Sequence, residues 1–145
     1  MEDQRKSLTL TIGWLILFVL GLLLAFQGLE SLIVAYRGAA DSLAGVSFQD
    51  LAKLNPALPD AIRGRRATAA SLAFSFGLLL MWMAVTAYRR REKWAWWALL
   101  CCMGLGSLAS LLRISLIGQR AGAIQPGVFL ALLLLALAIS YRDFK

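Results

Sequence analysis

The sequence predicts an all-α fold, a four-helix transmembrane bundle with a short amphipathic interfacial helix between the first two spans. The 145-residue chain is 60% hydrophobic and only 16% charged, whereas soluble domains carry roughly 25% charged residues. Four segments each contain about the 20 apolar residues that are needed to cross a bilayer. These segments contain no Asp, Glu or Lys, and Arg113 is their single Arg. Such depletion is expected because charged side chains are costly within a hydrocarbon core.

The four predicted spans form a single domain, residues 1–145. Their predicted boundaries are Leu8–Phe26, Ala67–Ala87, Trp94–Ile117 and Ala123–Tyr141. We expect the first span to be a retained anchor, since its apolar run is longer than that of a usual signal peptide. Its apolar pattern continues past Phe26, so we expect this helix to end at Gly38.

The long connection Gln27–Arg66 is too long for a structureless loop in so small a domain. Ser47–Asp50 resembles a capping box with Asp in place of the usual Glu or Gln. An apolar stripe follows on one face of Phe48–Leu54, and Asn55–Pro56 ends it. Pro59 can begin the next helix. We therefore predict a short amphipathic helix that lies on the bilayer or caps the bundle, and a lid over a cavity is the alternative interpretation.

Basic residues predict the orientation of the chain. An even number of spans places both termini and the turn between spans two and three on one side, with eight basic residues in short segments: Arg5, Lys6, Arg89, Arg90, Arg91, Lys93, Arg142 and Lys145. Short basic loops face the cytoplasm, so we expect both termini there. The net charge is +7, and we expect the basic residues to contact anionic lipid head groups and not nucleic acid.

Aromatic residues follow this basic turn directly. Trp94, Trp96 and Trp97 open the third span, and Tyr88 closes the second. Indole and phenol rings are enriched at membrane interfaces. We therefore predict that the tryptophans, together with the basic residues Arg89, Arg90 and Arg91, anchor the chain at the cytoplasmic interface. A tryptophan stacking site for a ligand is the alternative.

Three charged residues are candidates for interhelical or ligand contacts on the other side. Arg113 lies 19 residues beyond Trp94, about 28 Å along a helix, which places it near the non-cytoplasmic interface. Glu30 falls beyond the same interface and could pair with Arg113. The other interpretations are that Arg113 extends to lipid head groups while Glu30 is hydrated, or that Arg113 binds an anion together with Arg120.

Small residues mark faces where helices can approach closely. In the third span Cys102, Gly106 and Ser110 recur at four-residue spacing, and in the first span Gly13, Gly21 and Gly28 lie near one face. The pattern predicts close packing, either within the bundle or against a partner subunit.

The residue inventory also excludes several functions. The chain contains no histidine, the usual axial ligand of haem and the commonest metal ligand and general base. The spans lack the buried acid that a proton-coupled pump needs, and no phosphate-binding loop or serine nucleophile elbow is present. We therefore expect no catalytic residue, no metal and no cofactor.

The stretch RRREKWAWWALL, Arg89–Leu100, resembles a pattern found in uncharacterised small bacterial membrane proteins. The layout of four spans with a long first connection and a basic tail is similar to that of DoxX-like families. This resemblance implies a multi-pass protein of the bacterial inner membrane, and it implies no site residue.

Two functional hypotheses follow from the sequence. The first is a non-catalytic accessory or scaffold subunit of a larger membrane complex, for example respiratory or photosynthetic, bound to partner subunits or to further copies of itself. The second is a protein that binds or transports a hydrophobic molecule, such as a lipid or quinone, in a cavity under Gln27–Arg66, with Met81, Trp82 and Met83 nearby. An enzyme ranks third, since no acid–base pair is evident.

Overall fold

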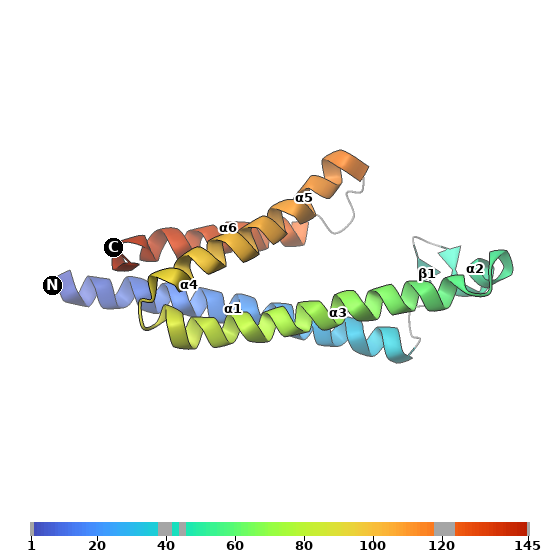
Figure 1. Ribbon diagram of the computed structural model, residues 1–145, viewed down its shortest axis with the longest axis horizontal. Helices are drawn as coiled ribbons and strands as arrows, with labels where there is room; N and C mark the ends of the chain where they lie inside the picture. The colour runs from blue at the N-terminus through green and yellow to red at the C-terminus, as the bar shows by residue number, and fades with distance from the viewer. Residues whose placement is uncertain (1, 38–41, 44–45, 118–123, 145) are drawn as a thin grey trace. The chain divides into compact units, whose positions relative to one another are not determined.

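The computed structural model is helical (Figure 1) and describes residues 2–37, 42–43, 46–117 and 124–144. A long helix is followed by a short hairpin, a short helix, a second long helix and six further helical segments. The elements are α1 (Glu2–Arg37), β1 (Ser42–Leu43), β2 (Val46–Ser47), α2 (Phe48–Leu54), α3 (Leu58–Met83), η1 (Ala84–Tyr88), α4 (Lys93–Ala98), η2 (Leu99–Gly104), α5 (Leu105–Ile117), α6 (Ile124–Ser140) and η3 (Tyr141–Phe144).

Three helical stretches of the described chain are long and apolar enough to cross a membrane. They are Leu8–Arg37, Leu58–Tyr88 and Lys93–Leu112. A shorter apolar helix, α6, covers the fourth predicted span with 17 residues. The predicted all-α class is therefore confirmed, apart from the small hairpin of β1 and β2.

The first two long helices exceed their predicted bounds. The helix α1 runs from Glu2 to Arg37, so the prediction that it continues beyond Phe26 is confirmed, while Gly38 lies outside the described residues. The helix α3 begins at Leu58, one residue before Pro59, so the prediction that a helix begins there is confirmed. Hydropathy marks only the stretch that suits a bilayer, whereas a helix continues wherever its backbone hydrogen bonds and packing allow. Most of the described part of Gln27–Arg66 is therefore helical.

The chain divides into two compact units, each described by itself. Unit 1 comprises residues 1–21 and 79–145, and unit 2 comprises residues 22–78. The core of unit 1 is built from apolar side chains of α1, α3, η1, α6 and the segments around them. It consists of Leu17, Leu20, Leu80, Ala84, Tyr88, Leu99, Leu133, Ala136, Leu137 and Phe144.

Unit 2 is held by a close approach of α1 to α3. An ideal Cβ placed on Gly28 would lie 2.5 Å from the Phe74 backbone nitrogen and 2.9 Å from the Ala70 carbonyl oxygen. Only a residue without a side chain permits this spacing. Nearby, the Arg66 Nε group donates a hydrogen bond of 3.2 Å to the Ser31 hydroxyl. The predicted role of Gly28 in close helix packing is therefore confirmed.

The helix α2 begins and ends as predicted. Ser47 is its N-cap and accepts a 3.1 Å hydrogen bond from the Asp50 backbone N–H. The Ser47 hydroxyl donates to the Asp50 carboxylate at 2.7 Å, and Lys53 donates to the same carboxylate at 2.8 Å. These two hydrogen bonds, with that from Lys53 the stronger influence, lower the pKa of Asp50. A two-residue hairpin pairs Ser42 with Ser47 before this helix, and the sequence did not predict it.

Candidate functional site

A buried hydrogen-bond chain joins η1 to α6 in unit 1. The Tyr88 and Ser140 side chains are both fully buried, and their hydroxyl groups are hydrogen-bonded to each other. Ser140 also donates to the Ala136 carbonyl oxygen at 2.8 Å. Each hydroxyl has one proton, so both protons are used when Tyr88 donates to Ser140 and Ser140 donates to Ala136. The polar groups of this part of the core are thereby satisfied, as an apolar surrounding requires.

Gly13 of α1 makes room for this hydrogen-bond chain. An ideal Cβ on Gly13 would lie 3.2 Å from the Tyr88 hydroxyl oxygen and 3.3 Å from the Ser140 Cβ atom. The Phe144 ring also packs against this tyrosine, with its centroid 4.8 Å from that of Tyr88. Three segments distant in sequence therefore meet at one tyrosine.

Two further hydrogen bonds connect the same elements. The Thr9 hydroxyl of α1 donates to Asp143 of η3 at 2.8 Å. The indole N–H of Trp96 in α4 donates to the Leu137 carbonyl oxygen at 3.1 Å. This carbonyl lies in the last turn of α6. These contacts stabilise the packing of the terminal turns.

The turn between η1 and α4 is closed by backbone hydrogen bonds. Arg91 donates to the Tyr88 carbonyl at 3.0 Å, and Glu92 donates to the Ala87 carbonyl at 3.0 Å. Arg91 has a φ of 60°, a left-handed conformation that a residue with a side chain adopts at a cost of about 1 kcal/mol. The Arg89 guanidinium lies over the Trp14 ring, 5.1 Å from its centroid. The turn therefore has a defined backbone and is attached to α1.

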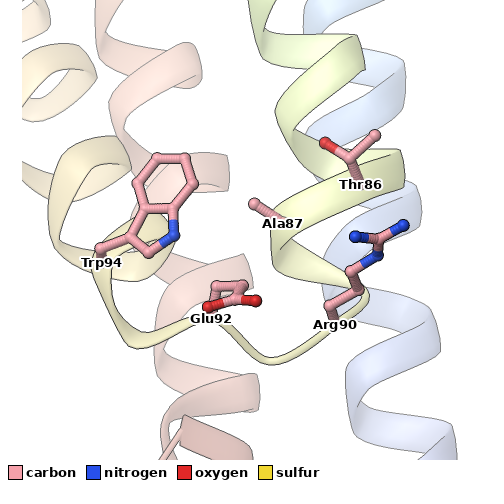
Figure 2. Close-up of a pocket in the computed structure, with 5 residues that line it drawn as sticks. All are labelled: Thr86, Ala87, Arg90, Glu92 and Trp94. Atoms are coloured by element: carbon pink, nitrogen blue, oxygen red, sulfur yellow. The ribbon is translucent and has the colours of Figure 1, made fainter.

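An open cavity of about 260 Å³ lies beside this turn. Its lining consists of Thr86, Ala87, Arg90, Glu92 and Trp94. Figure 2 shows Glu92 between the side chains of Arg90 and Trp94, with Thr86 on the Arg90 side. Chemically, the cavity offers a guanidinium donor, a carboxylate acceptor and an indole surface, and such groups bind charged or zwitterionic ligands.

The structure separates the predicted interface anchors into exposed and packed residues. Trp94 and Trp97 are 58% and 60% exposed, and Arg89, Arg90 and Arg91 are exposed as well. Trp96 is half-buried, with its ring 5.8 Å from that of Tyr141. The prediction that Tyr88 belongs to the interface belt is wrong, because its side chain is fully buried and hydrogen-bonded within unit 1. Its position at the end of a hydrophobic run did not distinguish these two environments.

The predicted contact between Glu30 and Arg113 stays a prediction. Glu30 lies in α1 and is exposed. Arg113 lies within α5, but its side chain is outside the described residues, as is the whole of Arg120.

Sequence reasoning did not find the cluster of Gly13, Tyr88 and Ser140, nor the cavity. One residue could have indicated the cluster. Ser140 lies at the end of a predicted apolar span, where a polar group needs a hydrogen-bond partner. Within the described ranges, no three His, Cys, Asp or Glu side chains group in a way that could hold a metal ion. Comparisons with protein-family models, with curated proteins and with solved structures find no match.

Proposed function

We propose that the chain is a four-span protein of the bacterial inner membrane with both termini in the cytoplasm, in a layout like that of DoxX-like proteins. The 17 residues of α6 supply the fourth span, since 17 is the lower end of the usual length of membrane helices. The exposed basic turn Arg89–Lys93 supports the orientation. The helix α2, in which no residue is buried, is proposed to rest on the opposite surface of the bilayer.

Cysteine labelling tests this topology. In a background that carries Cys101→Ser and Cys102→Ser, single cysteines replace the exposed residues Gln49 and Lys93. A membrane-impermeant maleimide should label Gln49→Cys in intact cells and Lys93→Cys only after permeabilisation. Labelling of both sites in intact cells, or of Lys93→Cys alone, would contradict the proposed orientation.

Within this membrane, we propose that the chain acts as a non-catalytic accessory subunit that binds a helix of a larger membrane complex. The observation that carries the proposal is the exposed small-residue face of the third span, consisting of Cys102, Gly106 and Ser110. Nothing described lies within 4 Å of a Cβ added at Gly106. The Ser110 hydroxyl donates to the Gly106 carbonyl at 2.9 Å, so the proton of this hydroxyl is already used within the helix.

Exposed leucines lie along one side of this face. Leu105 is 64% exposed and Leu112 is 49% exposed. Lipid chains adapt to side chains of any size, whereas a strip of small residues lets a second helix approach closely. The face therefore suits a partner helix.

The two native cysteines provide a matched test of this face. Cys101→Ser leaves only Cys102, on the face, and Cys102→Ser leaves only Cys101, on its flank; both thiols are free and exposed. A photoactivatable cross-linker attached to Cys102 should join the chain to one defined polypeptide. The same cross-linker attached to Cys101 should give a much lower yield of that product. Adducts only with lipid, or only with a second copy of this chain, would overturn the accessory role.

The alternative function is the binding of a hydrophobic molecule in a cavity under Gln27–Arg66. Trp82 is 71% exposed, so its ring is available to a hydrophobic molecule or to lipid. The cavity described at Thr86–Trp94 lies instead at the basic turn of unit 1. A lipid or quinone bound at fixed stoichiometry, without a protein partner, would favour this second function.

A further inference from the structure

The cavity at the basic turn contains one positive and one negative side chain that do not neutralise each other. Arg90 and Glu92 both line it and both are exposed. Within the described chain, neither side chain has an ion pair or hydrogen bond. Such groups are ordinarily hydrated, but here they share one hollow with the Trp94 indole. The hollow therefore presents two separated, opposite charges to a ligand.

Hydrogen bonds fix the backbone positions of these two residues. The Arg90 N–H donates to the Thr86 carbonyl at 3.2 Å and the Glu92 N–H donates to the Ala87 carbonyl at 3.0 Å. Arg91, between them, has the left-handed φ of 60°, and strained residues of this kind cluster at binding sites. The spacing between the two charged residues is consequently set by the fold of the turn.

The location of the cavity indicates where its ligand comes from. The apolar stretch Leu58–Tyr88 ends beside the cavity, and the stretch Lys93–Leu112 begins there. The ends of membrane helices lie at the level of lipid head groups, where exposed tryptophan rings are enriched. Trp94, 58% exposed, has this environment. A head group can enter the cavity while its acyl chains stay in the bilayer.

We propose that this cavity binds the head group of a phospholipid that carries a phosphate and a primary ammonium, phosphatidylethanolamine. The Arg90 guanidinium binds the phosphate through paired N–H donors. The Glu92 carboxylate accepts hydrogen bonds from the ammonium. The Thr86 hydroxyl already donates to the Trp82 carbonyl at 2.6 Å, so its oxygen is left as an acceptor facing the same hollow.

The size and charge of the cavity select among head groups. Its 260 Å³ is below the roughly 300–1,000 Å³ of sites that enclose drug-sized ligands, so it suits a head group and not a whole lipid. A choline group has no N–H to donate to Glu92. A phosphoglycerol group has no cation, which leaves the Glu92 carboxylate unpaired. Both should bind more weakly.

Native mass spectrometry of the full chain tests this assignment. The purified protein is equilibrated in mixed micelles with equimolar phosphatidylethanolamine, phosphatidylcholine and phosphatidylglycerol of identical acyl chains. We expect the ethanolamine lipid to be retained about tenfold more than the choline lipid, the effect of one charge-assisted hydrogen bond. Equal retention of these two lipids by the unchanged chain, or preferential retention of phosphatidylglycerol, would be enough to overturn the proposal.

Three variants then locate the site. Glu92→Gln should reduce ethanolamine-lipid retention to the choline level without reducing phosphatidylglycerol retention, and Arg90→Gln should reduce both. Lys93→Gln removes a neighbouring charge that does not line the cavity, and it should leave the lipid ratio unchanged. A ratio that survives Glu92→Gln would contradict the assignment.

A competition experiment with soluble O-phosphoethanolamine tests whether the cavity binds a lipid or a free metabolite with the same head group. We expect that this compound does not displace the lipid at equal concentration. Equal displacement would assign the cavity to a soluble ligand and overturn the lipid assignment. The result does not depend on the accessory role, since no partner protein is present in the measurement.

Discussion

The hydroxyl groups of Tyr88 and Ser140 share a buried hydrogen bond between residues that are 52 positions apart in the chain. This contact joins the end of one predicted span to the end of another. Because Ser140 also donates to Ala136 in its own helix, the tyrosine is linked through the serine to the α6 backbone. The contact explains why Gly13, and not a larger residue, lies opposite.

A double-mutant cycle of Tyr88→Phe and Ser140→Ala should reveal the energy of this contact. We expect a coupling of about 0.6 kcal/mol and at most about 1.7 kcal/mol, the range found for hydrogen bonds between membrane helices. The measurement is the free energy of unfolding of each variant in mixed micelles. Tyr36→Phe is the control, because Tyr36 is 78% exposed and its hydroxyl should matter little. Additive effects of the two changes would refute the coupling.

Gly28 and Gly64 should respond oppositely to alanine. Gly28→Ala forces the added Cβ to within 2.5 Å of the Phe74 backbone, so α1 and α3 must separate and we expect a loss of about 2 kcal/mol or more. Gly64, in α3, has nothing described within 4 Å of an added Cβ. Gly64→Ala should therefore be neutral or stabilise by up to about 1 kcal/mol through helix propensity.

Unfolding of both glycine variants under one condition gives the comparison. If Gly28→Ala were as stable as the unchanged chain, the close helix contact would be wrong.

The cap of α2 should depend on pH. Lys53 and then Ser47 lower the pKa of Asp50 below its ordinary value of 3.8. The stabilisation from the ionised carboxylate is therefore fully present above about pH 3.8 and is lost as the pH falls through the lowered pKa. A carboxyl NMR titration should show the Asp50 pKa rising more in Lys53→Gln than in Ser47→Ala. A larger rise in Ser47→Ala would reverse the assigned order of causes.

Hydropathy predicted the helical class and the central part of each long helix, because transfer of apolar side chains from water dominates the pattern. The Ser47 cap was also predictable, since a capping box is a local motif. The continuation of α1 beyond Phe26 and the start of α3 next to Pro59 were predictable as well, from the continued apolar pattern and from proline at a helix start. The close contact between Gly28 and the Phe74 backbone was not, because it depends on how α1 and α3 pack. The Tyr88–Ser140 contact depends on the fold bringing distant residues together, so a single sequence gave no register for it.

The cavity was missed for a related reason. Arg90 was interpreted as part of a basic run, and Glu92 within that run was given no role. The left-handed conformation of Arg91 and the return of the chain into α4 place Trp94 beside them, and the sequence contains no glycine in the turn to mark it. Only the folded turn reveals the separated charges.

The most direct test of the accessory role is native mass spectrometry of the complex isolated in mild detergent, with Gly106→Leu compared with Ala131→Leu. Both changes place a leucine side chain at an exposed helix position, Gly106 on the proposed face and Ala131 on α6. We expect the unchanged chain and Ala131→Leu to retain one partner subunit at fixed stoichiometry, whereas Gly106→Leu should remain folded and lose that partner. Retention of the partner by Gly106→Leu, or a chain that is isolated alone in all three cases, would contradict it.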